Sequence, residues 1–194
     1  DDELARIGRH VQGYVGSSLA RRIAGLEGVR PERPFAFELD GIVLNGRLDV
    51  LWARGEQALV LDYKTNALLG REPATIVDAE YRGQRTVYAL ACLRAGAREV
   101  EVVYHFLEAP EDIVASTYAD SDVPALEAEL AGAISRIRGG DFRPTPSPFA
   151  CSGCPALDVR ELEAEAREVA ARCLERLRQL RSRLCAEGVD GLLR

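Results

Sequence analysis

Two aspartates and one lysine lie in segments that are otherwise apolar enough to be buried strands. Asp49 lies within residues 46–52, and Asp62 and Lys64 lie within residues 59–65. Burying an unpaired charge is costly, so such residues usually pair, hold a metal ion or take part in chemistry. Two carboxylates and a lysine on neighbouring strands are the minimum that metal-dependent hydrolysis of a phosphodiester requires.

That hydrolysis needs a deprotonated water, neutralised charge on the phosphoryl oxygens and a stabilised leaving oxygen. Two carboxylates can hold Mg²⁺ or Mn²⁺, and Mg²⁺ uses only one or two carboxylates and keeps several waters. A nearby lysine can orient the attacking water or neutralise charge. The alternative interpretation of an isolated Asp-x-Lys is a salt bridge at an exposed strand edge, which is the more common case.

The spacing of the charged residues predicts that their side chains converge. Side chains at positions i and i+2 of a strand point to the same face, so Asp62 and Lys64 share a face and lie about 7 Å apart along the strand. The residue between them points to the opposite side. Asp49 is expected to face away from Leu48 and Val50 on the neighbouring strand, which brings all three charged groups to one side of the sheet.

A helical segment downstream carries a second polar pair. Gln84 and Tyr88 are four residues apart and so share one face of the predicted helix, with Tyr81 near that face. The alternative interpretation of these three residues is a partly buried aromatic stripe with a glutamine at its rim, because aromatic residues at helical spacing usually serve packing.

Taken together, these motifs resemble the PD-(D/E)XK nuclease superfamily, and within it the RecB/AddA-type nuclease domain at the C-terminus of bacterial helicase–nucleases. The resemblance covers about residues 14–157 and rests on three motifs: Gly46-Arg47-Leu48-Asp49, Asp62-Tyr63-Lys64-Thr65 and Gln84-x-x-x-Tyr88. Further similarity lies in residues 29–35 and in residues 142–155, which contain Cys151-x-x-Cys154.

The resemblance implies a role for each matching residue. Asp49 and Asp62 would bind a divalent metal, and the main-chain carbonyl of Tyr63 would complete the shell. Lys64 would be catalytic. The substrate-binding residues it implies are Gln84, Tyr88 and Thr65, where the glutamine–tyrosine pair would contact DNA or orient the active site.

Members of that family usually carry a further metal-binding histidine on a helix upstream of the first core strand. His10 is the candidate here, and it lies 22 residues before Glu32. The alternative is that the sequence begins after the true position or that this histidine is absent.

Related nucleases also hold an iron–sulfur cluster with four cysteines. Cys151 and Cys154 match the start of the C-terminal group, but Arg160 stands where a third could follow, and no cysteine precedes Cys92. A cluster of the family type is therefore not expected, and zinc bound with the help of a more C-terminal cysteine stays open.

The elements that position these residues follow from hydrophobic periodicity and turn residues. We expect helices at residues 3–25, 74–95, 122–137 and 159–186, and strands at residues 35–39, 42–52, 58–64, 99–107 and 113–118. This order predicts an α/β fold with a restriction-endonuclease-like mixed β-sheet core flanked by helices and an extra C-terminal helix. The predicted domains are a nuclease domain at residues 1–158 and a helical extension at residues 159–194.

Composition limits the class of protein. The 194 residues allow one sizeable core, and no run of about 18 apolar residues predicts a membrane span. The net charge of −6 argues against a general nucleic-acid coat, although the arginines of the first 33 residues could still hold a phosphate backbone. Five cysteines without a secretion signal favour a reducing compartment, so a cytoplasmic, nucleoid-associated location in a bacterial-type cell is expected.

The sequence therefore predicts a DNA nuclease that depends on Mg²⁺ or Mn²⁺, as an exonuclease module of a recombination or repair helicase–nuclease. Its partners would be DNA and a helicase motor, on the same polypeptide or on a partner subunit. The alternative is a weakly active or inactive DNA-binding or scaffolding module on the same fold. The charged triad favours the first hypothesis, whereas the acidic net charge and the doubtful histidine favour the second.

Overall fold

The computed structural model describes residues 2–141 and residue 175. The chain divides into two units, Asp1–Asp141 and Phe142–Arg194, and the description concerns the first. Several predictions lie outside the described residues: the cysteine-containing loop after residue 141, the domain boundary at residue 158 and the helix at residues 159–186.

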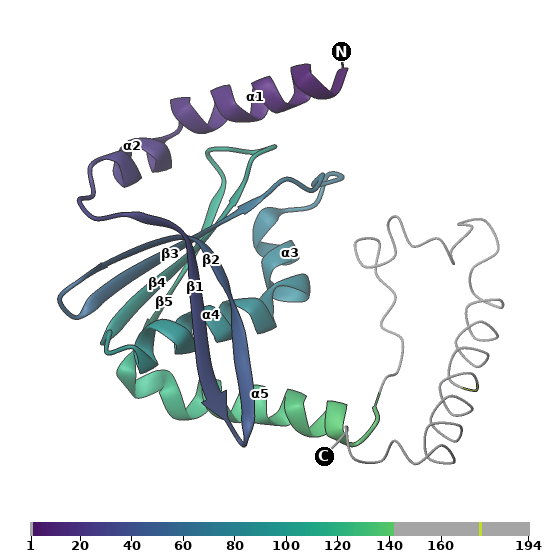
Figure 1. Ribbon diagram of the computed structural model, residues 1–194. Helices are drawn as coiled ribbons and strands as arrows, with labels where there is room; N and C mark the ends of the chain where they lie inside the picture. The colour runs from purple at the N-terminus through teal and green to yellow at the C-terminus, as the bar shows by residue number, and fades with distance from the viewer. Residues whose placement is uncertain (1, 142–174, 176–194) are drawn as a thin grey trace, which may run out of the picture. The chain divides into compact units, whose positions relative to one another are not determined.

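A five-stranded mixed sheet forms the centre of the first unit (Figure 1). The strands lie in sequence order, and only β3 and β4 pair in parallel. Their bounds are β1 Arg30–Leu39, β2 Ile42–Arg54, β3 Gln57–Lys64, β4 Glu99–Phe106 and β5 Ile113–Ala119. A parallel connection needs a long crossover, and two helices supply it between β3 and β4.

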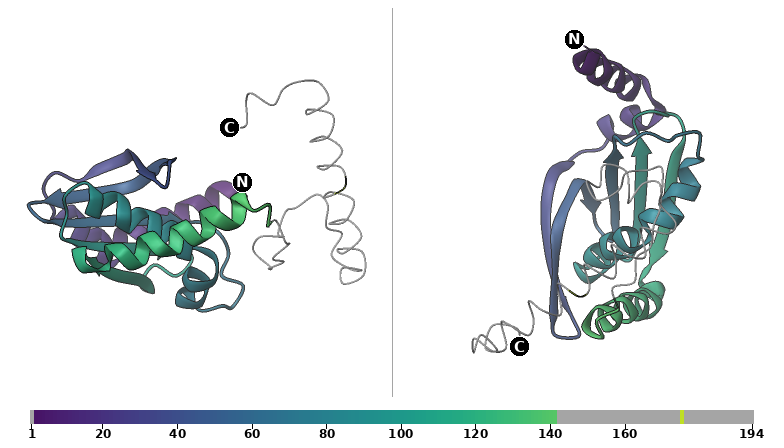
Figure 2. Two further views of the ribbon diagram at one scale, coloured as in Figure 1. Left: turned by 90° about the horizontal axis from the view of Figure 1, so that it is seen from below. Right: turned by 90° about the vertical axis from the view of Figure 1, so that its right-hand side faces the viewer.

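The helices cover both faces of this sheet (Figures 1 and 2). Their bounds are α1 Asp2–Gly16, α2 Ser18–Ala24, α3 Pro73–Glu80, α4 Arg82–Arg94 and α5 Val123–Arg138, with a short 3₁₀ helix at Asp120–Asp122 before α5. Apolar residues of α3, α4 and α5 form one core cluster with the sheet, and Leu19 and Ile23 of α2 form a smaller cluster on the opposite face. The predicted mixed sheet flanked by helices is confirmed. Among the described helices, none has the length and apolarity to cross a membrane.

The central strand β3 is buried on both faces, which explains its nearly continuous apolar sequence. Ala58 and Val60 belong to the larger cluster under α3, α4 and α5, whereas Leu59 and Leu61 belong to the smaller cluster under α2. Strand alternation then directs Asp62 to the larger cluster.

Two predicted helices are each broken in two. The predicted helix at residues 3–25 ends at Gly16, and Ser17 caps α2 by accepting a hydrogen bond from the N–H of Ala20 at 3.1 Å. The predicted helix at residues 74–95 is interrupted at Tyr81, where φ is −115° and ψ is 7°. Each break changes the direction of the helix axis. Hydrophobic periodicity can continue across so short a break, so it does not reveal it.

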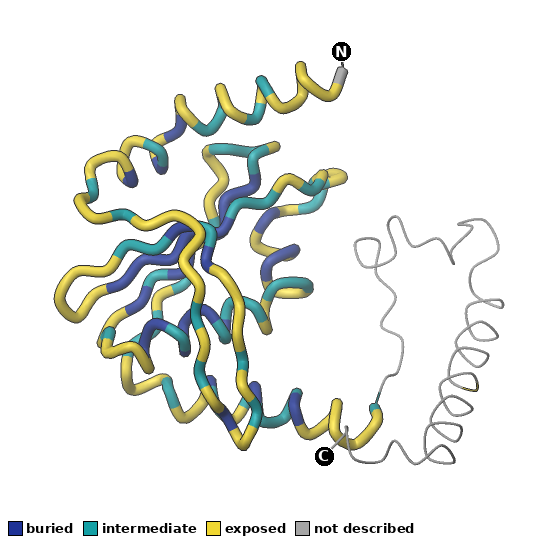
Figure 3. Tube along the Cα trace, in the orientation of Figure 1, coloured by how far each residue is buried: buried dark blue, intermediate teal, exposed yellow. Residues whose placement is uncertain are grey.

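Apolar residues at helical spacing form a stripe along α1, but this stripe is not a core contact. Four of its members are exposed, at 74%, 48%, 55% and 66% for Leu4, Ile7, Val11 and Val15. Figure 3 shows α1 mostly in the colour of exposed residues. Helix α1 instead contacts the sheet through Tyr14, whose ring packs against Tyr63 of β3 and His105 of β4, with centroids 5.2 and 5.5 Å apart.

Strand β1 begins earlier than predicted. Pro31 and Pro34 lie between the predicted helix at residues 3–25 and the predicted strand at residues 35–39, but in the structure they lie inside β1 and are paired with β2. Proline is tolerated there because β1 is an edge strand, whose outer side needs no donor. Between them, Glu32 has a positive φ of 52°, which marks an irregularity opposite Asp49.

The cap of α2 gives a stability prediction. Ser17 is fully buried, accepts from Ala20 and donates its hydroxyl to the carbonyl of Tyr14 at 2.7 Å. Ser17→Ala should lower the free energy of unfolding by about 1–2 kcal/mol in urea denaturation followed by circular dichroism. Ser18→Ala, which removes only an exposed hydrogen bond to Glu111, should change it by less than about 0.5 kcal/mol. Equal effects of the two substitutions would contradict the assignment of the cap.

Candidate active site

Four side chains that the sequence singled out form a closed ring of polar contacts. Lys64 Nζ donates to Gln84 Oε1 at 3.0 Å, and Gln84 Nε2 donates to the hydroxyl of Tyr88 at 2.8 Å. That hydroxyl donates to Asp62 Oδ2 at 3.0 Å. The ring closes where Asp62 Oδ1 lies 2.6 Å from Lys64 Nζ.

The donor and acceptor roles around this ring are fixed by the chemistry of its ends. An ammonium can only donate and an ionised carboxylate can only accept. The amide oxygen of Gln84 must therefore face Lys64, and the Tyr88 hydroxyl must accept from Gln84 and donate to Asp62. The contact of Asp62 Oδ1 with the ammonium is an ion pair, so Lys64 is the partner of this buried oxygen.

Two elements bring the ring together. Asp62 and Lys64 share one face of β3, as their spacing predicts, and both contact side chains of α4. Gln84 and Tyr88 lie one turn apart on α4, so their side chains reach the same point. Tyr88 is 6% exposed and packs edge to face against Phe35 of β1, with ring centroids 6.0 Å apart.

Asp49 joins the site through the main chain of β3. Its Oδ2 accepts a hydrogen bond from the N–H of Tyr63 at 3.0 Å. The predicted regular alternation around Asp49 is wrong, because Leu48 packs into the larger cluster and Val50 into the smaller one. The regular pairing of β2 with β3 extends from Val50 to Arg54. The N–H of Tyr63 lies beyond this pairing, and the carboxylate of Asp49 accepts its hydrogen bond instead.

Burial and charge oppose each other at Asp62. The residue is 3% exposed, and burial raises the pKa of its carboxyl above the usual value. The facing ammonium of Lys64 counteracts that rise, and the nearby charge of Asp49 adds to it. Asp62 therefore depends on a cation beside it to remain ionised.

Lys64 lies among aromatic rings as well as oxygens. Its side chain is 12% exposed, and Nζ lies 3.9 Å from the ring centroid of Tyr81 and 5.3 Å from that of Tyr104. Burial raises the pKa of Tyr81 to about 12, and it also raises the pKa of Tyr88 above the usual value. Both hydroxyls thus stay protonated at neutral pH and can donate.

Lys64 is the only lysine of the chain. The 25 basic residues counted as lysine or arginine are this lysine and 24 arginines. Arginine is a planar fork and does not replace a compact ammonium where space is closed. The one lysine therefore singles out position 64 by composition, independently of the motif around it.

Two further predicted residues, Thr65 and His10, are not members of the ring, and neither is the second histidine of the chain, His105. Thr65 follows Lys64 and is exposed. His10 Nδ1 lies 3.1 Å from the carbonyl oxygen of Leu107, whose N–H donates to the carbonyl of Lys64 at 2.9 Å. His105 is fully buried in β4, and its Nε2 lies 3.0 Å from the carbonyl oxygen of Pro110. Within residues 2–141 and residue 175, no three His, Cys, Asp or Glu side chains form a group that could hold a metal.

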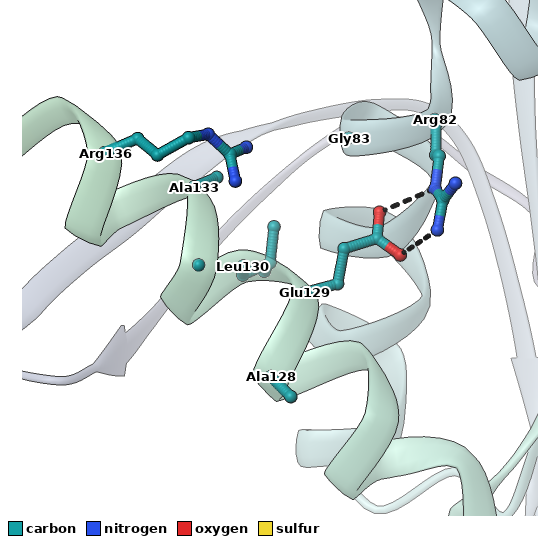
Figure 4. A pocket seen from close by; sticks show the side chains of 8 residues that line it. Arg82, Gly83, Ala128, Glu129, Leu130, Ala133 and Arg136 are labelled. Carbon is teal, nitrogen blue, oxygen red and sulfur yellow. Dashed lines mark hydrogen bonds and ion pairs between the residues drawn. The ribbon is translucent and has the colours of Figure 1, made fainter. Parts of the chain in front are cut away.

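A cavity of about 520 Å³ lies elsewhere, between α4 and α5 (Figure 4). Gly83 and Gly132 leave room between the helices, and Arg82, Glu129 and Arg136 line it. Arg82 holds both oxygens of Glu129 at 3.1 and 3.0 Å, which lowers the pKa of that carboxyl. None of the four ring residues lines this cavity.

Comparison with solved structures shows limited similarity in detail. Eighteen chains of solved structures match. One is the crystal structure of SSO0001, with 16% sequence identity, a TM-score of 0.39 and coverage of 78% of this chain. The chain spans 64% of the length of that protein. No curated protein matches the sequence.

Comparison with protein families is decisive because the match extends over most of the chain. The PD-(D/E)XK nuclease superfamily matches residues 4–159. That range includes all five strands, the ring and Asp49. The chain therefore belongs to the PD-(D/E)XK nuclease superfamily.

Proposed function

We propose that this nuclease-superfamily chain is a DNA nuclease that depends on Mg²⁺ or Mn²⁺ and works as an exonuclease module. We further propose that it serves a recombination or repair helicase–nuclease of the RecB/AddA type, with a helicase motor on the same polypeptide or on a partner subunit. The observation that carries the proposal is the closed ring of Asp62, Lys64, Gln84 and Tyr88 beside Asp49.

The residues present fit a divalent cation. The carboxylates of Asp49 and Asp62 and the main-chain carbonyl of Tyr63 would hold it, with His10 as a further candidate. The donor set supports this assignment, because two carboxylates and a main-chain carbonyl are oxygen ligands of the kind that Mg²⁺ prefers. Mg²⁺ needs few protein ligands because it keeps several waters. When bound, the cation would neutralise charge on the phosphoryl oxygens and acidify water.

The chain's own side chains divide the remaining work. Lys64 places a positive charge beside the carboxylates, where it can orient a water or neutralise the phosphate. Tyr88 holds one oxygen of Asp62 and so fixes the direction of the other. Both polar atoms of Gln84 have partners inside the ring, which favours an orienting role over direct contact with DNA. Thr65 is exposed next to Lys64 and is the better candidate for contact with the strand.

The alternative function is a weakly active or inactive DNA-binding or scaffolding module. The net charge of −6 supports it. A metal site with only two carboxylates from the described residues would also bind the cation weakly. Catalysis assays and binding assays separate the two functions.

Removal of Asp62 or Lys64 should abolish cleavage. Wild type should degrade linear DNA with Mg²⁺ or Mn²⁺, and Asp62→Ala and Lys64→Ala should each lower kcat by at least about 100-fold, because both groups act on developing charge. Arg98→Ala, which removes an exposed cation paired with Glu56, should cleave like wild type. Closed circular DNA should resist cleavage by an exonuclease.

Two results would contradict this assignment. Equal cleavage by wild type, Asp62→Ala and Lys64→Ala would remove the catalytic role. DNA binding without cleavage by wild type would favour the scaffolding function.

The need for a compact ammonium predicts that a conservative change fails. Lys64→Arg keeps the charge, but its planar fork cannot fit between Asp62, Gln84 and the Tyr81 ring in the same way. We expect kcat to fall at least about tenfold while the melting temperature stays near that of wild type. Cleavage at the wild-type rate would show that any cation serves at this position.

Metal binding should be measurable without activity. Saturating Mn²⁺ should raise the melting temperature of wild type, because a ligand at 100 times its Kd stabilises the folded state by about 2.7 kcal/mol. Asp49→Asn and Asp62→Asn should lose most of this shift in a thermal denaturation series with and without EDTA. His10→Ala tests the further ligand directly, and an unchanged shift in that variant would exclude His10 from the site.

A further inference from the structure

Tyr81 lies at the break between α3 and α4, next to the ring but outside it. Its main-chain N–H donates to the carbonyl of Val77 at 3.0 Å, and its carbonyl accepts from the N–H of Arg85 at 2.9 Å. These bonds end one helix and begin the next at the same residue. The break turns the Tyr81 side chain towards β3, where it lies against Lys64.

The ring of Tyr81 is held firmly in place. Its hydroxyl donates to Asn66 Oδ1 at 3.2 Å. Its ring stacks on Tyr104 with centroids 5.6 Å apart and an interplanar angle of 24°, and it packs at a tilt against Phe106. Tyr104 and Phe106 are fully buried, so the stack rests on the core of the sheet. The Tyr81 ring, held by Asn66 at its hydroxyl and by Tyr104 at its face, therefore offers a contact surface in a fixed position.

The ring face of Tyr81 is one of three groups that surround the ammonium of Lys64. That ammonium contacts Asp62 Oδ1 at 2.6 Å and Gln84 Oε1 at 3.0 Å, and the face of Tyr81 lies 3.9 Å away. A cation over an aromatic face is attracted by the ring quadrupole, most strongly where water is excluded. Without such contacts, the long flexible side chain of lysine would adopt many rotamers, and the ammonium would have no fixed position.

We propose that Tyr81 is a positioning residue for the reaction, whose ring face holds the ammonium of Lys64 against Asp62 and Gln84. The inference rests on the proposed nuclease function. Tyr81 acts through Lys64, so the aromatic face is the essential part, and the stack on Tyr104 should hold the ring in place without the hydroxyl bond to Asn66.

Kinetics of matched variants test the reaction role. Tyr81→Phe keeps the ring and should keep kcat within about twofold of wild type. Tyr81→Leu keeps an apolar side chain without a π face and should lower kcat by about 10- to 100-fold with KM nearly unchanged, because misplaced groups lose transition-state stabilisation. Tyr118→Leu removes a half-buried tyrosine from the same core cluster and should keep kcat. Equal losses in Tyr81→Leu and Tyr118→Leu, or no loss in Tyr81→Leu, would overturn the proposal.

The single lysine allows a second measurement that needs no activity. In the full chain labelled with ¹³C-lysine, one set of side-chain signals reports on Lys64. The ring current of Tyr81 should shift the Cε protons upfield in wild type and in Tyr81→Phe, and the shift should fall in Tyr81→Leu but not in Tyr118→Leu.

The two measurements distinguish a failure of the Tyr81–Lys64 contact from a failure of the proposed nuclease function. An unshifted Lys64 signal in wild type would overturn the contact itself, whether or not Tyr81→Leu folds. A shifted signal in a protein that cleaves no DNA would overturn the nuclease function and the reaction role, and would leave the contact as a structural one.

Discussion

The buried ion pair between Asp62 and Lys64 is the interaction on which the rest of the site depends. Their side chains are only 4% and 12% exposed, so both charges have left most of their water. Apolar residues in place of a buried pair are often neutral or more stable, by about 1–4 kcal/mol. Stability alone therefore does not explain the pair. Under the proposed function, the geometry of the pair serves the reaction, and the neighbouring elements are arranged to tolerate it.

The sheet and helix α4 lie on opposite sides of the ion pair, and both make its burial possible. The apolar residues of β3 bury the strand on both faces up to Asp62, which fixes the position of the carboxylate. Gln84 and Tyr88 then satisfy one donor of the lysine and one oxygen of the aspartate without adding charge. Because both come from one turn of α4, a shift of that helix would break both contacts together. The packing of α4 on the sheet thus controls the site directly.

Local sequence patterns predicted the strands and the sheet, because strand and helix periodicity decide which side chains share a face. The family resemblance, and not periodicity, implied that Gln84 and Tyr88 lie beside the site. Local patterns did not predict the helix breaks at Ser17 and Tyr81 or the irregularity at Asp49. Those features depend on tertiary contacts, such as the stack of Tyr81 on Tyr104 and the hydrogen bond from Tyr63 to Asp49. The exposure of the apolar stripe on α1 was also not predicted, because an amphipathic pattern does not show which face of the helix contacts the sheet.

The raised pKa of Asp62 has a consequence for the metal-free chain. The folded state binds the proton of this carboxyl more tightly than the unfolded state, so its contribution to stability falls as the pH rises through the raised pKa. A divalent cation would reverse that penalty, because it favours the ionised carboxylates that it binds. Under the proposed function, protons and the cation therefore compete for Asp62, and the ammonium of Lys64 favours the ionised carboxylate. The lysine then has two roles, as counter-charge before the cation arrives and as a catalytic group afterwards.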